Sequence, residues 1–353
     1  MKRVVGMVIG AAGLVSGAAA QSSVTVYGAI DLGVTYYKGG ASDKRIDSGI
    51  SWGSRLGFRG NEDLGGGLTA IFDLEMPILA DVGVVPGAVW GREAWLGVKS
   101  STLGTLTMGR QTDFMCDFQV LYSAATFRLG AYGFHPGDYD RVSGQRYDNS
   151  VKWVSPALGP VQLGAMVSLG EVAGSTSTRM GKSLGATYRN GPLSASLTYT
   201  STNDQVIDPG AQLGINTLNG VALTGPVTTD RVDILGAGAG YRVGSFWLKA
   251  LHTRTTLRTA TGSPTLKSTD LNGQYDVTPN SFVGAGFAHS SLESNAWKKF
   301  VLAYDYQLSK RTDVYVSYVH LKASDGNRAT LLALPSSTTD TASTLRVAMR
   351  HLF

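Results

Sequence analysis

The sequence predicts an all-β protein, a transmembrane 16-stranded antiparallel β-barrel. Three observations predict this fold class: apolar and polar residues alternate along the whole chain, short and long connections alternate between these segments, and the last segment is a strand that ends on Phe353. In a membrane barrel each lipid-facing apolar residue is followed by a lumen-facing polar one, and short turns at one end oppose long loops at the other. No stretch after Gln21 approaches the ~18 to 20 consecutive apolar residues that a helical span needs.

Residues 1–20 read as a secretory signal peptide, followed by a barrel domain over residues 21–353. Lys2 and Arg3 supply the basic region, residues 4–15 are apolar with small side chains, and residues 18–20 are alanines at a predicted cleavage site. The alternative, a transmembrane anchor, is less favoured because the apolar core is short and no stop-transfer charges follow it.

Turn residues divide the rest of the chain into sixteen predicted strands, the first over residues 24–37, the second over 51–60 and the third beginning at 68. Seven connections between strands are short: residues 62–67, 100–104, 155–160, 190–192, 241–244, 276–280 and 309–311. Eight are long: residues 38–48, 77–91, 111–147, 170–181, 201–230, 256–266, 291–296 and 322–341. A soluble sandwich has no reason to sort its loops by length between two ends.

The last strand has one largely apolar face and one face that carries Arg346 and Arg350. Side chains of a strand alternate between its two faces. The apolar face consists of Leu345, Val347, Met349, His351 and Phe353. Because the last strand of a closed barrel must pair with the first, we expect Phe353 to close the barrel against residues 24–37, with both termini on the periplasmic side.

Composition narrows the remaining possibilities. The single cysteine, Cys116, excludes an internal disulfide. The 45 glycines and 11 prolines favour tight turns over long helices. The net charge of +5, which becomes +3 without Lys2 and Arg3, is too weak to predict nucleic-acid binding, and no run of basic residues supports it. The five histidines show no metal-ligand spacing, so no metal and no cofactor are expected.

Short segments spread over the whole mature chain resemble the general porins of the beta-proteobacterial, neisserial type. These segments are residues 24–28 (VTVYG), 54–60 (SRLGFRG), 62–65 (EDLG), 95–99 (WLGVK), 109–111 (GRQ), 149–153 (NSVKW), 155–156 (SP), 306–312 (YQLSKRT) and 350–353 (RHLF). Their order and spacing together are more specific than any one of them.

The resemblance implies an outer-membrane homotrimer that passes ions and small hydrophilic solutes, with the third long loop folded into the lumen as a constriction. It also implies contact with outer-membrane lipid and lipopolysaccharide, and insertion by the barrel-assembly machinery through a signal that includes Phe353. The third loop departs from the family pattern because the usual Pro-Glu-Phe-Gly-Gly element is missing and Cys116 is unusual there. The shape and selectivity of the constriction are therefore not carried over.

The third loop, residues 111–147, is the longest of the eight, and loops of that length are usually functional or disordered. Its acidic residues are Asp113, Asp117, Asp138 and Asp140. The strands around it offer a predicted basic wall of Arg55, Arg59, Arg92, Arg110 and Lys152. The first two alternate with Leu56 and Phe58, so they face the lumen if those face lipid. We expect the acidic loop to oppose the basic wall across the pore, with mild anion preference.

Several alternatives stay open at this stage. Each arginine of the wall could be an ordinary solvated lumen residue, and Arg128 could pair with an aspartate of the loop. Gly236, Gly238 and Gly240 alternate within a strand and suggest barrel curvature or close subunit packing. A substrate-specific channel, a barrel enzyme and a soluble adhesin are less favoured functions, and an enzyme is not expected because no Ser/His/acid set can be assembled.

Overall fold

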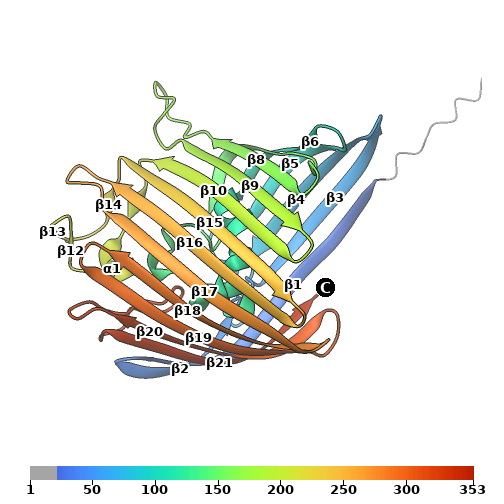
Figure 1. The fold of residues 1–353 in the computed structure, drawn as a ribbon. Coiled ribbons are helices and arrows are strands. Elements are labelled where there is room, and N and C mark those ends of the chain that lie inside the picture. The colour runs from blue at the N-terminus through green and yellow to red at the C-terminus, as the bar shows by residue number, and fades with distance from the viewer. Residues whose placement is uncertain (1–21) are drawn as a thin grey trace, which may run out of the picture.

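The structure, a computed structural model, describes residues 22–353. The predicted signal peptide lies outside these residues. Figure 1 shows one sheet of long tilted strands that curves round on itself, with the first strand beside the last. Within the described part of the chain, no helix is both long and apolar enough to cross a membrane.

The sheet closes because β1 (Ser23–Gly39) pairs with the last strand, β21 (Thr341–Leu352). On its other side β1 pairs with β2 (Ala41–Ser48) along its second half and with β3 (Arg55–Gly65) along its first half. These two segments together form the second strand of the barrel, interrupted at residues 49–54. The sheet has 17 strand segments, and counting β2 and β3 as one strand leaves the sixteen that were predicted.

The other strands follow in antiparallel order around the barrel. They are β4 (Leu68–Pro77), β5 (Glu93–Ser100), β6 (Gly104–Thr112), β7 (Arg146–Val154), β8 (Val161–Ser168), β9 (Gly181–Asn190), β10 (Leu193–Asn203), β15 (Arg231–Val243), β16 (Phe246–Arg258), β17 (Thr265–Thr278), β18 (Ser281–Leu292), β19 (Asn295–Gln307) and β20 (Thr312–Ala323). The connection from β10 to β15 holds α1 (Pro209–Leu213) and two short hairpins, β11 (Val206–Ile207) with β14 (Val227–Thr228) and β12 (Thr217–Leu218) with β13 (Val221–Ala222).

The last strand has the two faces that its sequence predicts. Val347 and Met349 are exposed on the outside, whereas Arg346 and Arg350 are buried on the inside. Phe353 pairs with Gly28 through two backbone hydrogen bonds, at 3.1 and 3.2 Å. The closure of the last strand against the first is therefore confirmed, and both described ends of the chain lie at the end of the barrel that carries the short turns.

Two of the eight predicted long loops are wrong. Residues 38–48 are instead strand, because β1 and β2 continue to a tight turn at Gly40, whose φ is +89°. Residues 41–44 are exposed on both faces of this hairpin, so the apolar–polar alternation that identifies a strand is lost there. Of residues 291–296, four belong to β18 and β19, and residues 293–294 form a two-residue turn in which Glu293 has a φ of +53°.

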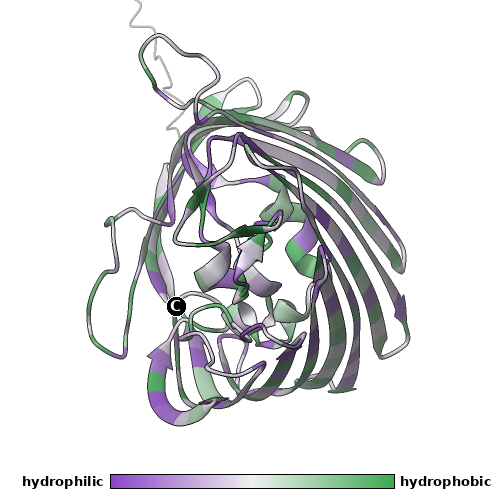
Figure 2. Ribbon diagram, turned by 90° about the vertical axis from the view of Figure 1, so that its left-hand side faces the viewer, coloured by the Kyte–Doolittle hydropathy of each residue, from purple (hydrophilic) through white to green (hydrophobic). Residues whose placement is uncertain are grey.

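The third loop folds into five short helical turns inside the ring of strands (Figure 2). These are η1 (Met115–Gln119), η2 (Val120–Tyr122), η3 (Ala124–Phe127), η4 (Gly130–Gly133) and η5 (Pro136–Asp138). They contact β9, β10 and the strands from β15 to β19, with the longest turn, η1, against β10. We refer to residues 113–145 as the inner loop.

Aromatic side chains of the inner loop pack where the wall has glycines. A Cβ atom added at Gly238 would lie 2.1 Å from the ring of Tyr122, and one at Gly284 would lie 2.5 Å from the ring of Phe127. Interpreting Gly238 as a site of subunit packing is therefore wrong, because its open side faces the inner loop. The missing side chains leave room for the rings, which close packing requires.

Candidate pore constriction

The first two arginines of the predicted basic wall project to the lumen side and pair with carboxylates of the neighbouring strand β4. The Nε atom of Arg55 lies 2.9 Å from Glu75, and an Nη atom of Arg59 lies 2.7 Å from Asp73. The hydroxyl of Tyr27 donates to Asp73 at 2.5 Å. The sequence analysis did not assign Asp73 and Glu75 to the constriction. They alternate with the apolar Leu74, and this alternation, which placed Arg55 in the lumen, places both carboxylates there as well.

The other basic-wall residues are held in different ways. The Nε atom of Arg92 donates to Glu75 at 2.5 Å, so this carboxylate holds two arginines. Arg110 pairs with Asp148 at 2.5 Å. Lys152 lies 2.5 Å from Asp117 and so joins the wall to the inner loop. Among the described residues, this is the one ion pair between the predicted basic wall and the predicted acidic loop residues.

The other three predicted acidic residues do not reach the pore. Asp113 is buried against Arg141, whose Nε atom lies 3.1 Å away. Asp138 accepts hydrogen bonds from the backbone N–H and hydroxyl of Ser143. These carboxylates hold the inner loop together, because a buried charge must have an oppositely charged partner or several hydrogen-bond donors beside it.

His135 joins the inner loop to the barrel wall. One ring nitrogen lies 2.5 Å from Asp140 of the loop and the other lies 2.6 Å from Asp270 on β17. Burial alone would lower the pKa of His135, but the negative charges of Asp270 and Asp140 raise it to about 10. The imidazolium form is therefore held at neutral pH, and it can donate to both carboxylates at once.

The ionisation of the two neighbouring loop carboxylates differs. Burial raises the pKa of Asp138 to about 6, with a further contribution from the negative charge of Asp140. Burial would also raise the pKa of Asp140, but the charge and hydrogen bond of His135 lower it. Asp140 thus carries the negative charge that faces His135.

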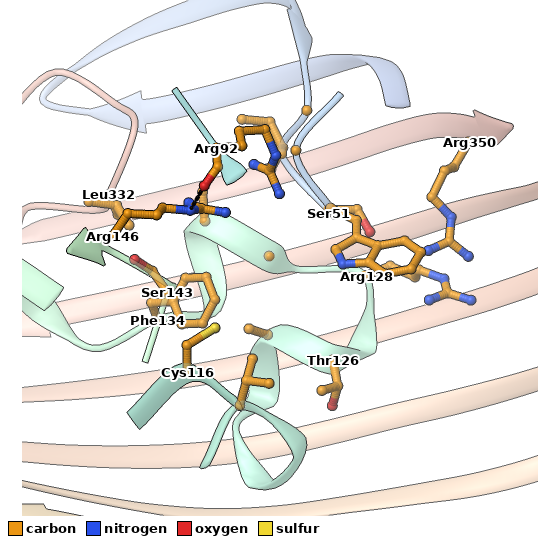
Figure 3. Close-up of a pocket in the computed structure, with 18 residues that line it drawn as sticks. Ser51, Arg92, Cys116, Thr126, Arg128, Phe134, Ser143, Arg146, Leu332 and Arg350 are labelled. Atoms are coloured by element: carbon orange, nitrogen blue, oxygen red, sulfur yellow. Dashed lines mark hydrogen bonds between the residues drawn. The ribbon is translucent and has the colours of Figure 1, made fainter. Parts of the chain in front are cut away.

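A cavity of about 670 Å³ lies between the inner loop, residues 49–53 between β2 and β3, and Arg350 of the last strand. Its four charged lining residues are all arginines: Arg92, Arg128, Arg146 and Arg350. Figure 3 shows their side chains around the cavity, with the inner loop on one side. We call these four residues the arginine ring. No aspartate or glutamate is among the described residues that line this cavity.

The sequence identified the arginine ring incompletely. Arg92 was in the predicted wall, and Arg350 was placed in the lumen by its strand phase but was not assigned to the constriction. Arg146 is the first residue of β7, and no sequence pattern identified it as a constriction residue. Arg128 was considered as a partner for a loop aspartate; its partner is instead Asp305 on β19, at 3.1 Å.

A second cavity, of about 430 Å³, adjoins the first and shares Arg92 and Arg146 with it. It is of mixed charge, because Asp73, Glu75 and Asp117 line it together with basic residues. The two cavities thus present different electrostatic surfaces to a solute in the lumen. The larger cavity is the more basic of the two.

Comparison with known proteins agrees with the barrel. Residues 8–326 match the family described as Gram-negative porin. Outer membrane porin protein 32 of Delftia acidovorans is 32% identical over 90% of this chain and 89% of its own length. An outer membrane porin protein of Bordetella pertussis is 29% identical over 86% of this chain and 90% of its own length.

Solved structures show the same architecture. The anion-selective porin from Comamonas acidovorans superposes with a TM-score of 0.78 and 25% identity, over 94% of this chain and 100% of that chain. The trimer form of OmpT of Vibrio cholerae superposes with a TM-score of 0.68 at 17% identity, over 94% of this chain and 99% of that chain, which shows a shared fold. The chain therefore belongs to the Gram-negative porins, as an outer-membrane barrel of the beta-proteobacterial type that works as a general diffusion channel.

Proposed function

We propose that this porin prefers anions and that the arginine ring sets the preference. The observation that carries the proposal is the lining of the larger cavity, in which four arginines occur without a carboxylate. Fixed charges of one sign along a narrow passage raise the local concentration of ions of the opposite sign. Rings of arginine or lysine are the arrangement that favours anions in pores.

The carboxylate partners of the arginine ring support a mild preference over a strong one. Arg92 pairs with Glu75 at 2.5 Å, and Arg146 lies 3.7 Å from Glu93. Each positive charge is therefore partly balanced, but its carboxylate stands outside the larger cavity. The solved porin from Comamonas acidovorans is itself described as anion-selective, which favours the same preference here.

The predicted basic wall and acidic loop enter the proposal in a smaller role. We assign Arg55, Arg59 and Lys152, which line the second cavity, to the lumen wall, where each has a carboxylate partner. Arg110 pairs with Asp148 and lines neither cavity, so we leave it out of the constriction. Of the four loop aspartates, we assign a role in the pore to Asp117 alone. A wall of paired charges orients polar solutes through a transverse field more than it selects an ion.

Reversal potential in a KCl gradient across a planar bilayer tests the proposal. We expect the wild-type porin to prefer chloride, and the double variant Arg92→Gln/Arg146→Gln to lose much of that preference. Arg242→Gln is the matched control, because Arg242 pairs with Asp276 near the turn after β15 and lines neither cavity. An unchanged reversal potential in the double variant would refute the assignment to the arginine ring.

We further propose that the barrel is a homotrimer without enzymatic activity, consistent with a family and fold of channels. Its exposed outer side chains, such as Val347 and Leu197, would contact outer-membrane lipid, lipopolysaccharide or a second protomer. Phe353 would act in recognition by the barrel-assembly machinery, as the resemblance implies. Crosslinking in outer membranes, together with the yield of Phe353→Ala in that membrane, tests the trimer and the assembly role.

A further inference from the structure

The arginine ring is divided into two pairs. Arg146 donates a hydrogen bond from its Nε atom to the backbone oxygen of Arg92 at 3.0 Å. Arg128 and Arg350 share a carboxylate, because the first lies 3.7 Å from Asp313 and the second is hydrogen-bonded to it. Figure 3 shows Arg92 and Arg146 together at one side of the cavity, and Arg128 and Arg350 together at the other.

Each guanidinium group is held by a hydrogen bond from its Nε atom and has N–H donors that are not used in the structure. Arg128 uses Nε and one Nη atom on Asp305, and Arg350 uses Nε and one Nη atom on Asp313. Arg92 and Arg146 are held through Nε alone. Within residues 22–353 the other Nη atoms have no hydrogen-bond acceptor. A guanidinium with free N–H groups in a fixed plane matches a carboxylate better than it matches a spherical ion.

Three of the four side chains are partly exposed, with an exposed fraction of 21% for Arg92, 16% for Arg128 and 18% for Arg146, whereas Arg350 is nearly buried at 9%. A bound anion would therefore displace little water from them and find the groups already oriented.

The rest of the cavity lining is uncharged and largely apolar. It includes Ile50, Val120, Phe134 and Leu332, with Ser51, Thr126 and Ser143 as the hydroxyl groups. A cavity of about 670 Å³ lies within the range of small-molecule sites, in which a mostly apolar surface carries a few placed polar groups. Two cationic ends and an apolar remainder select a ligand with two anionic ends and an apolar middle.

We propose that the larger cavity binds organic dianions that carry two carboxylates at the ends of an apolar spacer. One carboxylate contacts Arg92 and Arg146, the other contacts Arg128 and Arg350, and the spacer lies against the apolar lining. This inference rests on the proposed anion preference and adds a solute class to it. A monocarboxylate with the same spacer reaches one pair of arginines and leaves the other unused.

The test is transient block of the chloride current through single purified channels in a planar bilayer. Adipate is compared with hexanoate, and terephthalate with benzoate, so that an aliphatic and an aromatic spacer are tested separately. We expect the half-blocking concentration of the dianion to be about tenfold lower than that of its monoanion, which is what one more charge-assisted hydrogen bond supplies. Equal half-blocking concentrations in both comparisons would overturn the inference.

Variants at the two ends separate this site from general attraction of anions. Arg92→Gln and Arg128→Gln should each bring the dianion close to its monoanion, whereas Arg242→Gln should keep the difference. A tenfold difference that survives in both glutamine variants would overturn the two-ended site. The reversal potential of the same channels is measured in parallel: anion preference without dianion preference refutes this inference alone, and absence of anion preference refutes the proposed function.

Discussion

The two faces of the inner loop use charge in opposite ways. On the face toward the strands from β15 to β19, His135 is bonded to two carboxylates, and the Nζ atom of Lys299 donates to the backbone oxygens of Gly133 and Phe134 at 2.5 Å. On the face toward the cavity, Arg128 is held by Asp305 of β19 through two nitrogens and keeps its other Nη atom free. The first face holds the loop in place, and the second presents it to solutes.

The difference shows that exposure, more than the sign of the charge, decides what a charged residue does here. A charge buried behind the loop needs a carboxylate or several hydrogen-bond partners, because an uncompensated charge there costs several kcal/mol. A charge beside the lumen remains hydrated and can be left partly unpaired. Substitutions on the two faces should therefore act on different observables: the packing of the loop in one case, and ion preference in the other.

The largest effect is expected for Arg141→Ala, at an ion pair buried within the inner loop. The guanidinium of Arg141 lies 3.1 Å from Asp113 and also donates to the backbone oxygen of Gln145 at 2.9 Å. Removing it leaves the buried Asp113 unpaired, at a cost of about 3–5 kcal/mol to the folded loop. We expect larger and noisier single-channel conductance, because the loop no longer holds one position in the lumen.

The double variant Arg141→Ala/Asp113→Ala is the control for this effect. It removes both charges, so it should disturb the conductance less than Arg141→Ala alone. Quiet single channels of wild-type conductance in Arg141→Ala would show that the loop is not held by this pair.

A smaller effect is expected for His135→Gln, since glutamine still donates to one of the two carboxylates. The pKa of His135 rises from 6.5 to about 10 on folding, so the stabilisation is fully present below pH 6.5 and is lost as the pH rises through about 10. The difference in unfolding temperature between wild type and variant should shrink across that range. His320, which bonds to Ser343 at 2.8 Å and contacts neither carboxylate, gives a matched control: His320→Gln should keep the pH dependence that His135 causes. A constant difference for His135→Gln would contradict the ion-pair account.

Steric contact between the loop and the wall is tested by Gly238→Val. The new side chain would meet the ring of Tyr122 and the amide of Gln119, and such overpacking costs about 1–3 kcal/mol. We expect faster hydrogen exchange in residues 119–122. At Gly273 the nearest atom to an added Cβ is 3.9 Å away, so Gly273→Val should leave that exchange unchanged. Equal exchange rates in both variants would mean that the loop does not rest on Gly238.

The barrel was predictable from the sequence because strand periodicity places side chains without knowledge of the partners. That rule put Arg55 and Arg350 in the lumen, and it would have found Glu75 as well. This alternation rule does not apply to the inner loop, because the loop consists of short helical turns without one repeat of side-chain direction. Asp140 was expected in the pore, but its histidine partner also bonds to Asp270, which is 135 residues from His135 in the chain. A contact between such distant residues has no local signal.

The smallest effect is expected at Cys116, which lines the larger cavity at the boundary between the two faces. Burial raises the pKa of its thiol, so the group is neutral at pH 7 and adds no charge beside the arginine ring. Serine has nearly the same size and is also neutral at pH 7, so the substitution changes neither the charge nor the width of the cavity. Cys116→Ser should therefore keep the wild-type conductance and reversal potential. A shift of the reversal potential toward stronger anion preference would mean that the thiol is ionised in the pore, and that the cavity is less basic than its four arginines indicate.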